Sequence, residues 1–448
     1  MSDPHFCCGV VEGFYGRPWN PRQRHQLFKW MQSGGLNTYL YAPKDDIKHR
    51  ACWREPYDEA EASEVAALIR DAHRHGLDFI YALAPGLDLR FADPVDAAVL
   101  ETKLSQLIDL GCRHFAVLFD DIPAQLDPQS AARFASPALA QAAATNGVYA
   151  FLRQRIPEAR LLFCPTVYCA RMAEPSVTEA SYLREIGETL DSAIGFLWTG
   201  PDIVSETVSV ESIRELTGVI RRKPVIWDNL FANDYDPRRF YLGPYAGRSG
   251  AIRAEVAGIL ANPNCQFEVN FAPLRTFCAY LREGPTFSPR EAFEEAIENW
   301  LPSFQVRGGD PFSREDVALL ADLFYLPFEF GPSVRQYLGD FKRLLGTHPR
   351  GWGEERDRAL QTGNRIALLF GKATALQNRD LLYSFYPQLW EIKESALLLQ
   401  AWVQWRHSHP DSLEGFSMPE LRPGVFRGSV VALLERMLPM DDTGHFSP

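Results

Sequence analysis

The sequence predicts a (β/α)₈ barrel of the TIM type followed by an all-α helical bundle. Eight short apolar runs recur through the first two-thirds of the 448 residues, and helix-like segments separate them. The runs are continuous rather than alternating, which is typical of parallel strands that are buried on both faces. After about residue 289 the runs stop and long helical patterns replace them. Eight strand–helix units are the number that closes such a barrel.

The predicted strands span the barrel in order along the chain. They are His5–Val11, Asn37–Ala42, Phe79–Ala84, His114–Phe119, Arg160–Cys164, Ala193–Trp198, Pro224–Trp227 and Gln266–Asn270. An open, doubly wound sheet is the alternative architecture for alternating strands and helices. We favour the barrel because eight units is its characteristic number.

Amphipathic segments between the strands predict the covering helices. They include Arg22–Met31, Ala60–His75, Ala97–Leu110 and Glu211–Ile220. In the last segment the apolar side chains recur at helical spacing, which places them on one face. Gly76 follows the second of these segments, at the position where a helix commonly ends.

The predicted domains are a catalytic barrel over 1–288, a helical bundle over 289–440 and a loose tail over 441–448. Between Val334 and Leu345 the apolar residues follow a helical repeat, and Gly346 and Pro349 then predict the end of that helix. Arg356–Gln377 and Pro387–Trp405 are two further predicted helices. Several long helices without strands are typical of a bundle.

Charge and composition exclude several classes of partner. The formal net charge is −11, and such a surface repels phosphate backbones, so we expect no nucleic acid partner. The N-terminus lacks the pattern of a secretory signal, and no apolar run approaches the ~18 residues that span a bilayer. Eight cysteines occur without a Cys-x-x-Cys pair, which favours reduced thiols and a cytoplasmic protein.

Polar and aromatic side chains follow the predicted strands, at the end of a barrel where active sites lie. The segments at these ends are Glu12–Gly16, Lys44–Asp46, Pro85–Gly86, Asp120–Asp121, Thr166–Tyr168, Trp198–Thr199, Trp227–Asn229 and Asn270, with Asn233–Tyr235 just beyond the seventh. Acids, amides and aromatic faces are the usual lining of a sugar-binding site, because hydroxyls need polar partners and the ring face stacks.

Asp120 and Asp121 are the predicted catalytic pair. Adjacent carboxylates raise each other's cost of ionising, so one can stay protonated while the other is an anion. The structural alternative is a helix cap, which aspartate often provides. Asp45 and Asp46 are a rival pair, but the preceding Lys44 can neutralise them and their position before a helix favours a structural turn.

The sequence predicts no metal and no cofactor. Two His-x-His patterns, His73 with His75 and His407 with His409, fall at predicted helix ends rather than at strand ends. Histidine in a last helical turn is explained by the helix dipole. No glycine-rich phosphate loop of the Walker or Rossmann type occurs.

The chain resembles the glycoside hydrolases of family 84, the protein O-GlcNAcase group. The segments that carry this resemblance run through the barrel in order: Gly9–Trp19, Leu36–Asp46, Phe79–Asp88, Phe115–Ile122, Phe163–Cys169, Leu197–Pro201, Pro224–Asp236 and Leu242–Arg248. The similarity fades in the helical region, which looks like the stalk-type domain of that family. That region is also where we expect a homodimer interface, if one forms.

The resemblance implies a retaining β-N-acetylglucosaminidase that uses substrate-assisted catalysis, an exception to the two-carboxylate scheme. Asp120 would polarise the acetamido group of the sugar, and Asp121 would act as general acid and then general base. The resemblance also implies further substrate-binding residues. Those expected to bind hydroxyls or orient the acetamido group are Gly13, Lys44, Asn229, Asp234 and Asn270. Those expected to line the pocket are Cys164, Tyr168, Trp227 and Tyr235.

The implied substrate is terminal β-linked N-acetylglucosamine (GlcNAc) on proteins or glycans, with Ser/Thr-linked sugar favoured. Two departures from the family pattern, Met172 and Phe196, leave the preference for the group beyond the sugar open. A catalytically silent sugar-binding module and an endo-acting hyaluronidase are the alternative functions. The intact aspartate pair argues against the first, and the net charge of −11 argues against an acidic polymer as substrate.

Overall fold

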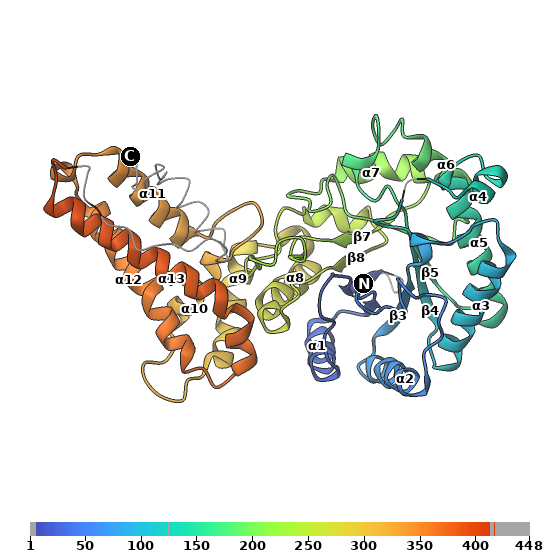
Figure 1. The fold of residues 1–448 in the computed structure, drawn as a ribbon, viewed down its shortest axis with the longest axis horizontal. Coiled ribbons are helices and arrows are strands. Elements are labelled where there is room, and N and C mark those ends of the chain that lie inside the picture. Colours follow the sequence, from blue (N-terminus) through green and yellow to red (C-terminus); the bar gives the residue numbers. More distant parts are fainter. Residues whose placement is uncertain (1–5, 124, 413–415, 417–448) are drawn as a thin grey trace. The chain divides into compact units, whose positions relative to one another are not determined.

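The computed structural model describes residues 6–123, 125–412 and 416. Eight parallel strands close into a barrel in the order β1 to β8, which confirms the predicted fold class (Figure 1). The strands are β1 (Cys7–Glu12), β2 (Thr38–Tyr41), β3 (Asp78–Leu83), β4 (His114–Leu118), β5 (Leu161–Cys164), β6 (Gly195–Trp198), β7 (Pro224–Asp228) and β8 (Gly258–Ala261). The seam pairs Cys7 with Gly258, so β8 closes the barrel onto β1.

The position predicted for the eighth strand was wrong. Gln266–Asn270 does not form a strand: Phe267–Asn270 is a 3₁₀ turn that leads into the next helix. The strand is Gly258–Ala261, which pairs with both β7 and β1. No local pattern distinguishes Gly258–Ala261 from other short apolar segments, and pairing on both edges identifies it as a strand. Asn262, not Asn270, therefore follows the last strand.

The helices between the strands lie outside the barrel wall, as Figure 1 shows. They are α1 (Pro21–Gly34), α2 (Glu59–Arg74), α3 (Pro94–Asp109), α4 (Pro128–Arg133), α5 (Pro137–Arg155), α6 (Ser181–Thr189) and α7 (Val210–Ile220). The four helices predicted from amphipathic segments are confirmed, with small differences at their ends. Asn20 and Asp58 begin α1 and α2 with capping boxes, in which the side chain accepts from the third backbone N–H.

The chain divides into two compact units. The barrel unit comprises 6–234, 245–265 and 277–289, and the helical unit comprises 235–244, 266–276 and the described residues from 290 onward. Helix α8 (Phe271–Glu283) has residues in both units. The remaining helices are α9 (Pro289–Trp300), α10 (Arg314–Leu323), α11 (Pro332–Gly346), α12 (Glu354–Thr374) and α13 (Arg379–Ser408).

The predicted helices of the second unit are present, and one of them begins earlier than predicted. Helix α13 starts at Arg379 and contains Pro387, where the sequence placed its beginning. Proline favours the first helical turn, but Asn378 provides the actual cap by accepting from the backbone N–H of Leu381. Residues 441–448, the predicted tail, lie outside the described residues.

Strand pairing in the described part after residue 300 is limited to an isolated antiparallel bridge between Val306 and Leu376. The helical unit has its own apolar core, which includes Trp300, Tyr337 and Phe385. Across the described residues, no helix is both long enough and apolar enough to cross a membrane.

Candidate active site

The aspartate pair lies one residue beyond the end of β4, and contacts to its backbone hold it in place. Asp121 has a φ of 51°, a left-handed conformation that costs a non-glycine residue roughly 1–3 kcal/mol and is concentrated at functional sites. The Arg50 guanidinium donates to both backbone oxygens, at 3.4 Å to that of Asp120 and 2.9 Å to that of Asp121. Arg50 is itself buried, so it fixes the turn that carries both carboxylates.

Asp120 is a buried carboxylate with one charged partner. Its Oδ2 accepts a short hydrogen bond from Lys44 Nζ, and the Lys44 side chain is only 3% exposed. Burial alone would raise the pKa of Asp120, but the charge and hydrogen bond of Lys44, with the charge of Arg50, lower it below the usual value. The carboxylate is therefore an anion near neutral pH.

The second oxygen of Asp120 lacks the ion-pair partner of the first. Asp120 Oδ1 is buried and has no hydrogen-bond partner among the described residues. A buried acceptor without a donor costs about 1–3 kcal/mol, so its presence needs an explanation. A donor group on a bound substrate would supply the missing hydrogen bond.

Asp121 has a different environment from its neighbour, because its side chain is exposed to solvent. The hydroxyl of Tyr168 donates to Asp121 Oδ1 at 3.0 Å, and that of Tyr15 donates to Oδ2 at 3.2 Å. Burial, with smaller contributions from the nearby aspartates, raises the pKa of Tyr15 to about 12 and raises the pKa of Tyr168 further. Both phenols therefore keep their protons and orient an accessible carboxyl group.

Two other carboxylates at strand ends are fully engaged within the protein. Glu12, at the end of β1, pairs with Arg24 at 2.8 and 2.9 Å and also accepts from the backbone of Trp19. Asp228, at the end of β7, forms a two-pronged ion pair with Arg248 at 2.6 and 2.7 Å. Such saturated pairs leave no acceptor facing a ligand, which indicates structural roles.

The rival pair Asp45–Asp46 also has internal partners. Asp46 Oδ2 accepts from the hydroxyls of Tyr41 at 2.8 Å and Tyr57 at 2.6 Å, while Asp45 accepts from the backbone N–H of Gly16 at 3.1 Å. These bonds tie the loop after β2 to its neighbours. The geometry thus favours Asp120 and Asp121 over this pair.

Several predicted pocket residues lie together on the barrel interior. Cys164, Tyr168 and Trp227 belong to one buried apolar cluster, and Lys44 Nζ lies 5.9 Å from the ring centroid of Trp227. A Cβ on Gly13 would lie 2.2 Å from the Trp227 ring, so only glycine fits beside that indole. Burial raises the pKa of the Cys164 thiol well above its usual value, which keeps the thiol neutral.

Amides and a third acid surround the ends of β7 and β8. Asn229 Oδ1 accepts from Asn262 Nδ2 at 2.9 Å, and Asn229 Nδ2 donates to the Ile203 backbone oxygen at 2.8 Å. Sequence analysis missed Asn262 because it misplaced the last strand. Asp234 Oδ2 accepts from the backbone N–H of Tyr15 at 2.9 Å, which links the loop after β7 to the loop after β1.

Tyr235 and Asn270 belong to the helical unit. The Tyr235 hydroxyl lies 2.7 Å from that of Tyr241, and the Asn270 side chain donates to the backbone oxygen of Gln266 at 3.0 Å. Their predicted roles toward a sugar remain predictions.

The two departures from the family pattern have different surroundings. Phe196 is fully buried and lies against Phe163, with ring centroids 6.0 Å apart, so it packs the barrel wall and offers no surface to a ligand. Met172 is partly buried and packs against the apolar cluster that contains Tyr168. Of the two, Met172 remains the candidate for contact with the group beyond the sugar.

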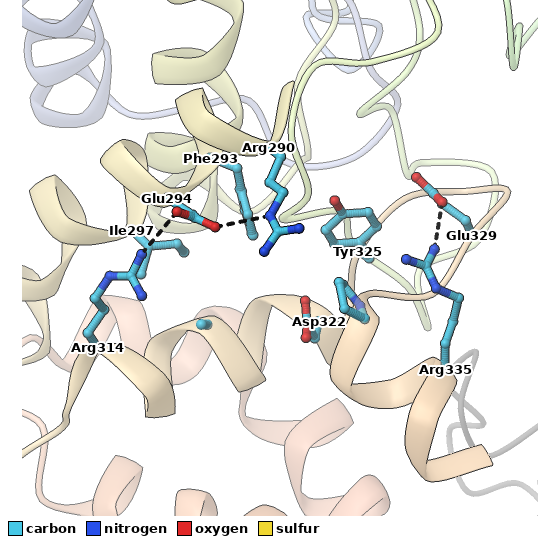
Figure 2. Close-up of a pocket in the computed structure, with 11 residues that line it drawn as sticks. Arg290, Phe293, Glu294, Ile297, Arg314, Asp322, Tyr325, Glu329 and Arg335 are labelled. Atoms are coloured by element: carbon cyan, nitrogen blue, oxygen red, sulfur yellow. Dashed lines mark hydrogen bonds and ion pairs between the residues drawn. The ribbon is translucent and has the colours of Figure 1, made fainter. Parts of the chain in front are cut away.

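A cavity of about 400 Å³ lies in the helical unit. Figure 2 shows three arginines at its edge, each facing a glutamate. Arg290 pairs with Glu294 at 3.2 Å and Arg335 with Glu329 at 2.9 Å. These are exposed ion pairs, and no residue predicted for the active site lines this cavity.

Among the described residues, the group placed to hold a metal ion consists of His25, Asp71 and His75. His25 lies on α1, and the other two lie at the end of α2 rather than at a strand end. The sequence pattern paired His75 with His73, whereas the structure brings His75 next to His25 and Asp71.

Comparison with known proteins gives consistent results. The family model for β-N-acetylglucosaminidase matches residues 8–307. Protein O-GlcNAcase of Rattus norvegicus and that of Mus musculus are each 31% identical over 640 residues, covering 97% of this chain and 70% of theirs. A solved structure of a mutant O-GlcNAc hydrolase from Thermobaculum terrenum superposes with a TM-score of 0.77 at 25% identity, covering 89% of this chain and 83% of the other.

Proposed function

The chain belongs to the β-N-acetylglucosaminidases of glycoside hydrolase family 84, and from this premise we propose that it removes terminal β-linked GlcNAc from Ser and Thr of proteins with retention of configuration. The chain is thus a glycoside hydrolase, and the proposal concerns its mechanism and its preferred substrate. The O-GlcNAcase relatives support a glycoprotein as substrate.

The observation that carries the mechanism is the difference between the two adjacent aspartates. Asp120 is a buried anion held by Lys44, with Oδ1 facing no protein donor among the described residues. Asp121 is exposed and oriented by two phenols. Asp120 thus offers a fixed hydrogen-bond acceptor, and Asp121 offers a carboxyl group that can exchange protons with a leaving group and with water.

In the proposed first step, the acetamido oxygen of the sugar attacks the anomeric carbon and the glycosidic C–O bond breaks. Asp121 donates its proton to the departing oxygen. Asp120 Oδ1 accepts a hydrogen bond from the acetamido N–H, and this bond increases the negative charge on the acetamido oxygen that attacks. The product of this step is an oxazoline protonated on nitrogen (an oxazolinium ion), whose N–H stays hydrogen-bonded to Asp120 Oδ1, and the departing group leaves as a neutral alcohol.

In the second step, water attacks the same carbon from the face that the leaving group vacated. Asp121 now takes a proton from that water, and the oxazoline ring reopens to the acetamide. Two inversions give net retention. Because the internal nucleophile is part of the substrate, no carboxylate needs to reach the opposite ring face, and two neighbouring side chains are sufficient.

We assign the remaining predicted residues to substrate binding. Binding of hydroxyl groups or orientation of the acetamido group is assigned to Gly13, Lys44, Asn229, Asp234 and Asn270. Lining of the pocket around the acetamido group and the ring is assigned to Cys164, Tyr168, Trp227 and Tyr235. The contacts of Lys44 with Asp120 and of Asn229 with Asn262 support placing both near the sugar.

We also propose a cytoplasmic protein, since all eight cysteines are free thiols, as in a reducing compartment. A homodimer through the helical domain stays a prediction that sedimentation can test. A silent sugar-binding module is less favoured, because sugar binding alone gives no use for an exposed carboxyl group oriented by two phenols. An endo-acting hyaluronidase is less favoured, because the net charge of −11 repels an acidic polymer.

Leaving-group dependence in Asp120→Asn and Asp121→Asn tests the assigned roles. If Asp121 is the acid, its amide variant should recover most activity with a nitrophenyl glycoside, whose leaving group needs no proton, and lose about 10²–10⁴-fold with an alkyl or seryl glycoside. Asp120→Asn should lose rate with every leaving group, because oxazoline formation itself is impaired.

Substrate changes provide the control for the same experiment. An N-trifluoroacetyl analogue has a weaker internal nucleophile and should react much more slowly with the unmodified enzyme. Equal rates for this analogue and its parent, or identical leaving-group responses of the two variants, would refute the assignment. Hydrolysis of glycopeptides measured beside chitobiose then tests the preference for protein-linked sugar.

A further inference from the structure

We propose that His25, Asp71 and His75 bind a divalent transition-metal ion of the zinc class on the outside of the barrel. The site would join α1 to the end of α2 and is independent of the hydrolytic reaction. Each of the three residues offers a ligand atom, and these atoms all lie within 4.8 Å of one another. Histidine nitrogens with one carboxylate oxygen are a common ligand set for zinc.

The ligand atoms are grouped closely enough for one ion to contact all three after small adjustments. With metal–ligand bonds near 2.0–2.1 Å, two ligand atoms of a tetrahedral zinc lie about 3.3 Å apart. His25 Nδ1 lies 2.9 Å from Asp71 Oδ2, and the three ligand atoms lie within 4.8 Å of one another. Small side-chain rotations are enough to place an ion among the three ligand atoms, and water would complete the shell.

The surroundings of His75 are suited to a ligand. Its Nδ1 lies 2.8 Å from the backbone oxygen of Asp71, and in the tautomer that donates from Nδ1 to this oxygen, Nε2 is the ligand atom. Metal-bound histidines commonly donate their other ring N–H to a carbonyl in this way, which fixes the ring. The rings of His25 and Phe28 pack against His75, with centroids 5.2 and 6.0 Å away.

Exposure favours an accessible but preformed site. The side chains of His25, Asp71 and His75 are 45%, 22% and 12% exposed. An ion can therefore reach the cluster from solvent, while two of the three ligands are already held by the protein.

The proposed site is separate from the catalytic centre. Its residues lie on helices that cover the barrel, whereas Asp120 and Asp121 follow β4 at the strand ends. Linking two neighbouring helices would stabilise the folded barrel, because an ion that binds only the native state shifts the folding equilibrium. The inference does not depend on the proposed sugar chemistry.

Zinc binding to the full chain tests the proposal. Protein stripped with EDTA and desalted is titrated with Zn²⁺ in competition with a chromophoric chelator, and thermal unfolding is followed in parallel. We expect one tight equivalent per chain. At a free zinc level 100 times Kd, native-state binding should raise the midpoint of barrel unfolding by about 5 °C.

Single substitutions identify the site. His25→Gln and Asp71→Asn should each lower zinc affinity by about 10–100-fold or more, because loss of a residue that only supports a metal ligand already costs about that much. His73→Gln is the matched control, since His73 is an exposed histidine on the same turn of α2 but outside the cluster. It should bind zinc as the unmodified chain does.

Three outcomes would overturn the proposal: zinc binding only in the millimolar range, equal affinity in all variants, or loss of affinity in His73→Gln. Glycosidase activity provides a separate readout. Stripped and zinc-loaded protein should hydrolyse a chromogenic substrate at equal rates, and activity that disappears with EDTA and returns with zinc would contradict a site separate from catalysis.

Discussion

Replacing Lys44 by methionine should move the acidic limb of the pH–activity profile to higher pH. Lys44 supplies the positive charge next to the buried Asp120, and methionine keeps most of the side-chain volume without that charge. Asp120 would then be a buried carboxylate stabilised by the charge of Arg50, with a smaller contribution from His49. Its neutral form becomes more favourable, so protonation of Asp120 begins at a higher pH.

The size of the effect follows from the contact. Two unit charges about 4 Å apart interact by about 4 kcal/mol at an effective dielectric constant of 20, and 1.36 kcal/mol corresponds to one pKa unit. Removing one partner of a buried pair costs about 3–5 kcal/mol, a similar figure. With Arg50 still in place, we expect the limb to rise by about 2–3 units.

The same substitution should also lower the stability of the folded protein near neutral pH. The pKa of Asp120 is depressed in the folded state, so its contribution to stability is present above the unfolded pKa and is lost as pH falls through the folded value. Lys44→Met removes that contribution near neutral pH. The variant should therefore unfold at lower urea near pH 7, and the difference should shrink toward acid.

The assay is kcat/KM for a chromogenic β-N-acetylglucosaminide from pH 4 to 9, because this ratio reports the ionisations of the free enzyme. Loss of substrate contacts by Lys44 lowers the whole curve but does not move its limb. Lys48→Met is the control, since Lys48 pairs with the partly exposed Glu61 and should leave the limb in place. An unmoved limb in Lys44→Met would refute the assigned electrostatics.

Two further substitutions test the packing around the site. Arg248→Met breaks the buried pair with Asp228 and should lower the free energy of unfolding, measured in urea, by about 3–5 kcal/mol. Arg214→Met is the control: it breaks an exposed pair and should change the free energy of unfolding by about 0–1 kcal/mol. Similar losses in both variants would contradict the burial argument. Gly13→Ala places a methyl group 2.2 Å from the Trp227 ring, so the indole must move. Such overpacking costs about 1–3 kcal/mol, and if the indole contacts the substrate, kcat/KM should fall roughly 10- to 100-fold. An unchanged kcat/KM would place the indole away from the substrate.

The barrel could be predicted from sequence because burial on both faces produces continuous apolar runs at each strand. Seven of the predicted runs overlap strands of the structure, and the eighth prediction failed at Gln266–Asn270. Gly258–Ala261 became a strand through hydrogen bonds to β7 and β1, which no local pattern displays. The misplaced strand is also the reason that Asn262 was missed.

The sequence also placed acidic groups at several strand ends, but it did not show which of their oxygens have partners inside the protein. Glu12, Asp46 and Asp228 turned out to be saturated by partners inside the barrel unit. Availability depends on which donors reach a carboxylate, and those donors come from other parts of the chain. Arg248, for example, reaches Asp228 across 20 residues of sequence.

By itself, the sequence determined the fold class, seven of the eight strands and the adjacency of Asp120 and Asp121, because apolar runs and neighbouring residues are local properties. Only the tertiary structure decided how the two acids differ. Lys44, 76 residues away from Asp120, holds that carboxylate as an anion, while Asp121 faces solvent. The same holds for the His25–Asp71–His75 cluster, which two packed helices assemble. Charge, burial and ligand geometry depend on distances in space, and these are set by the packing of segments that are remote in sequence.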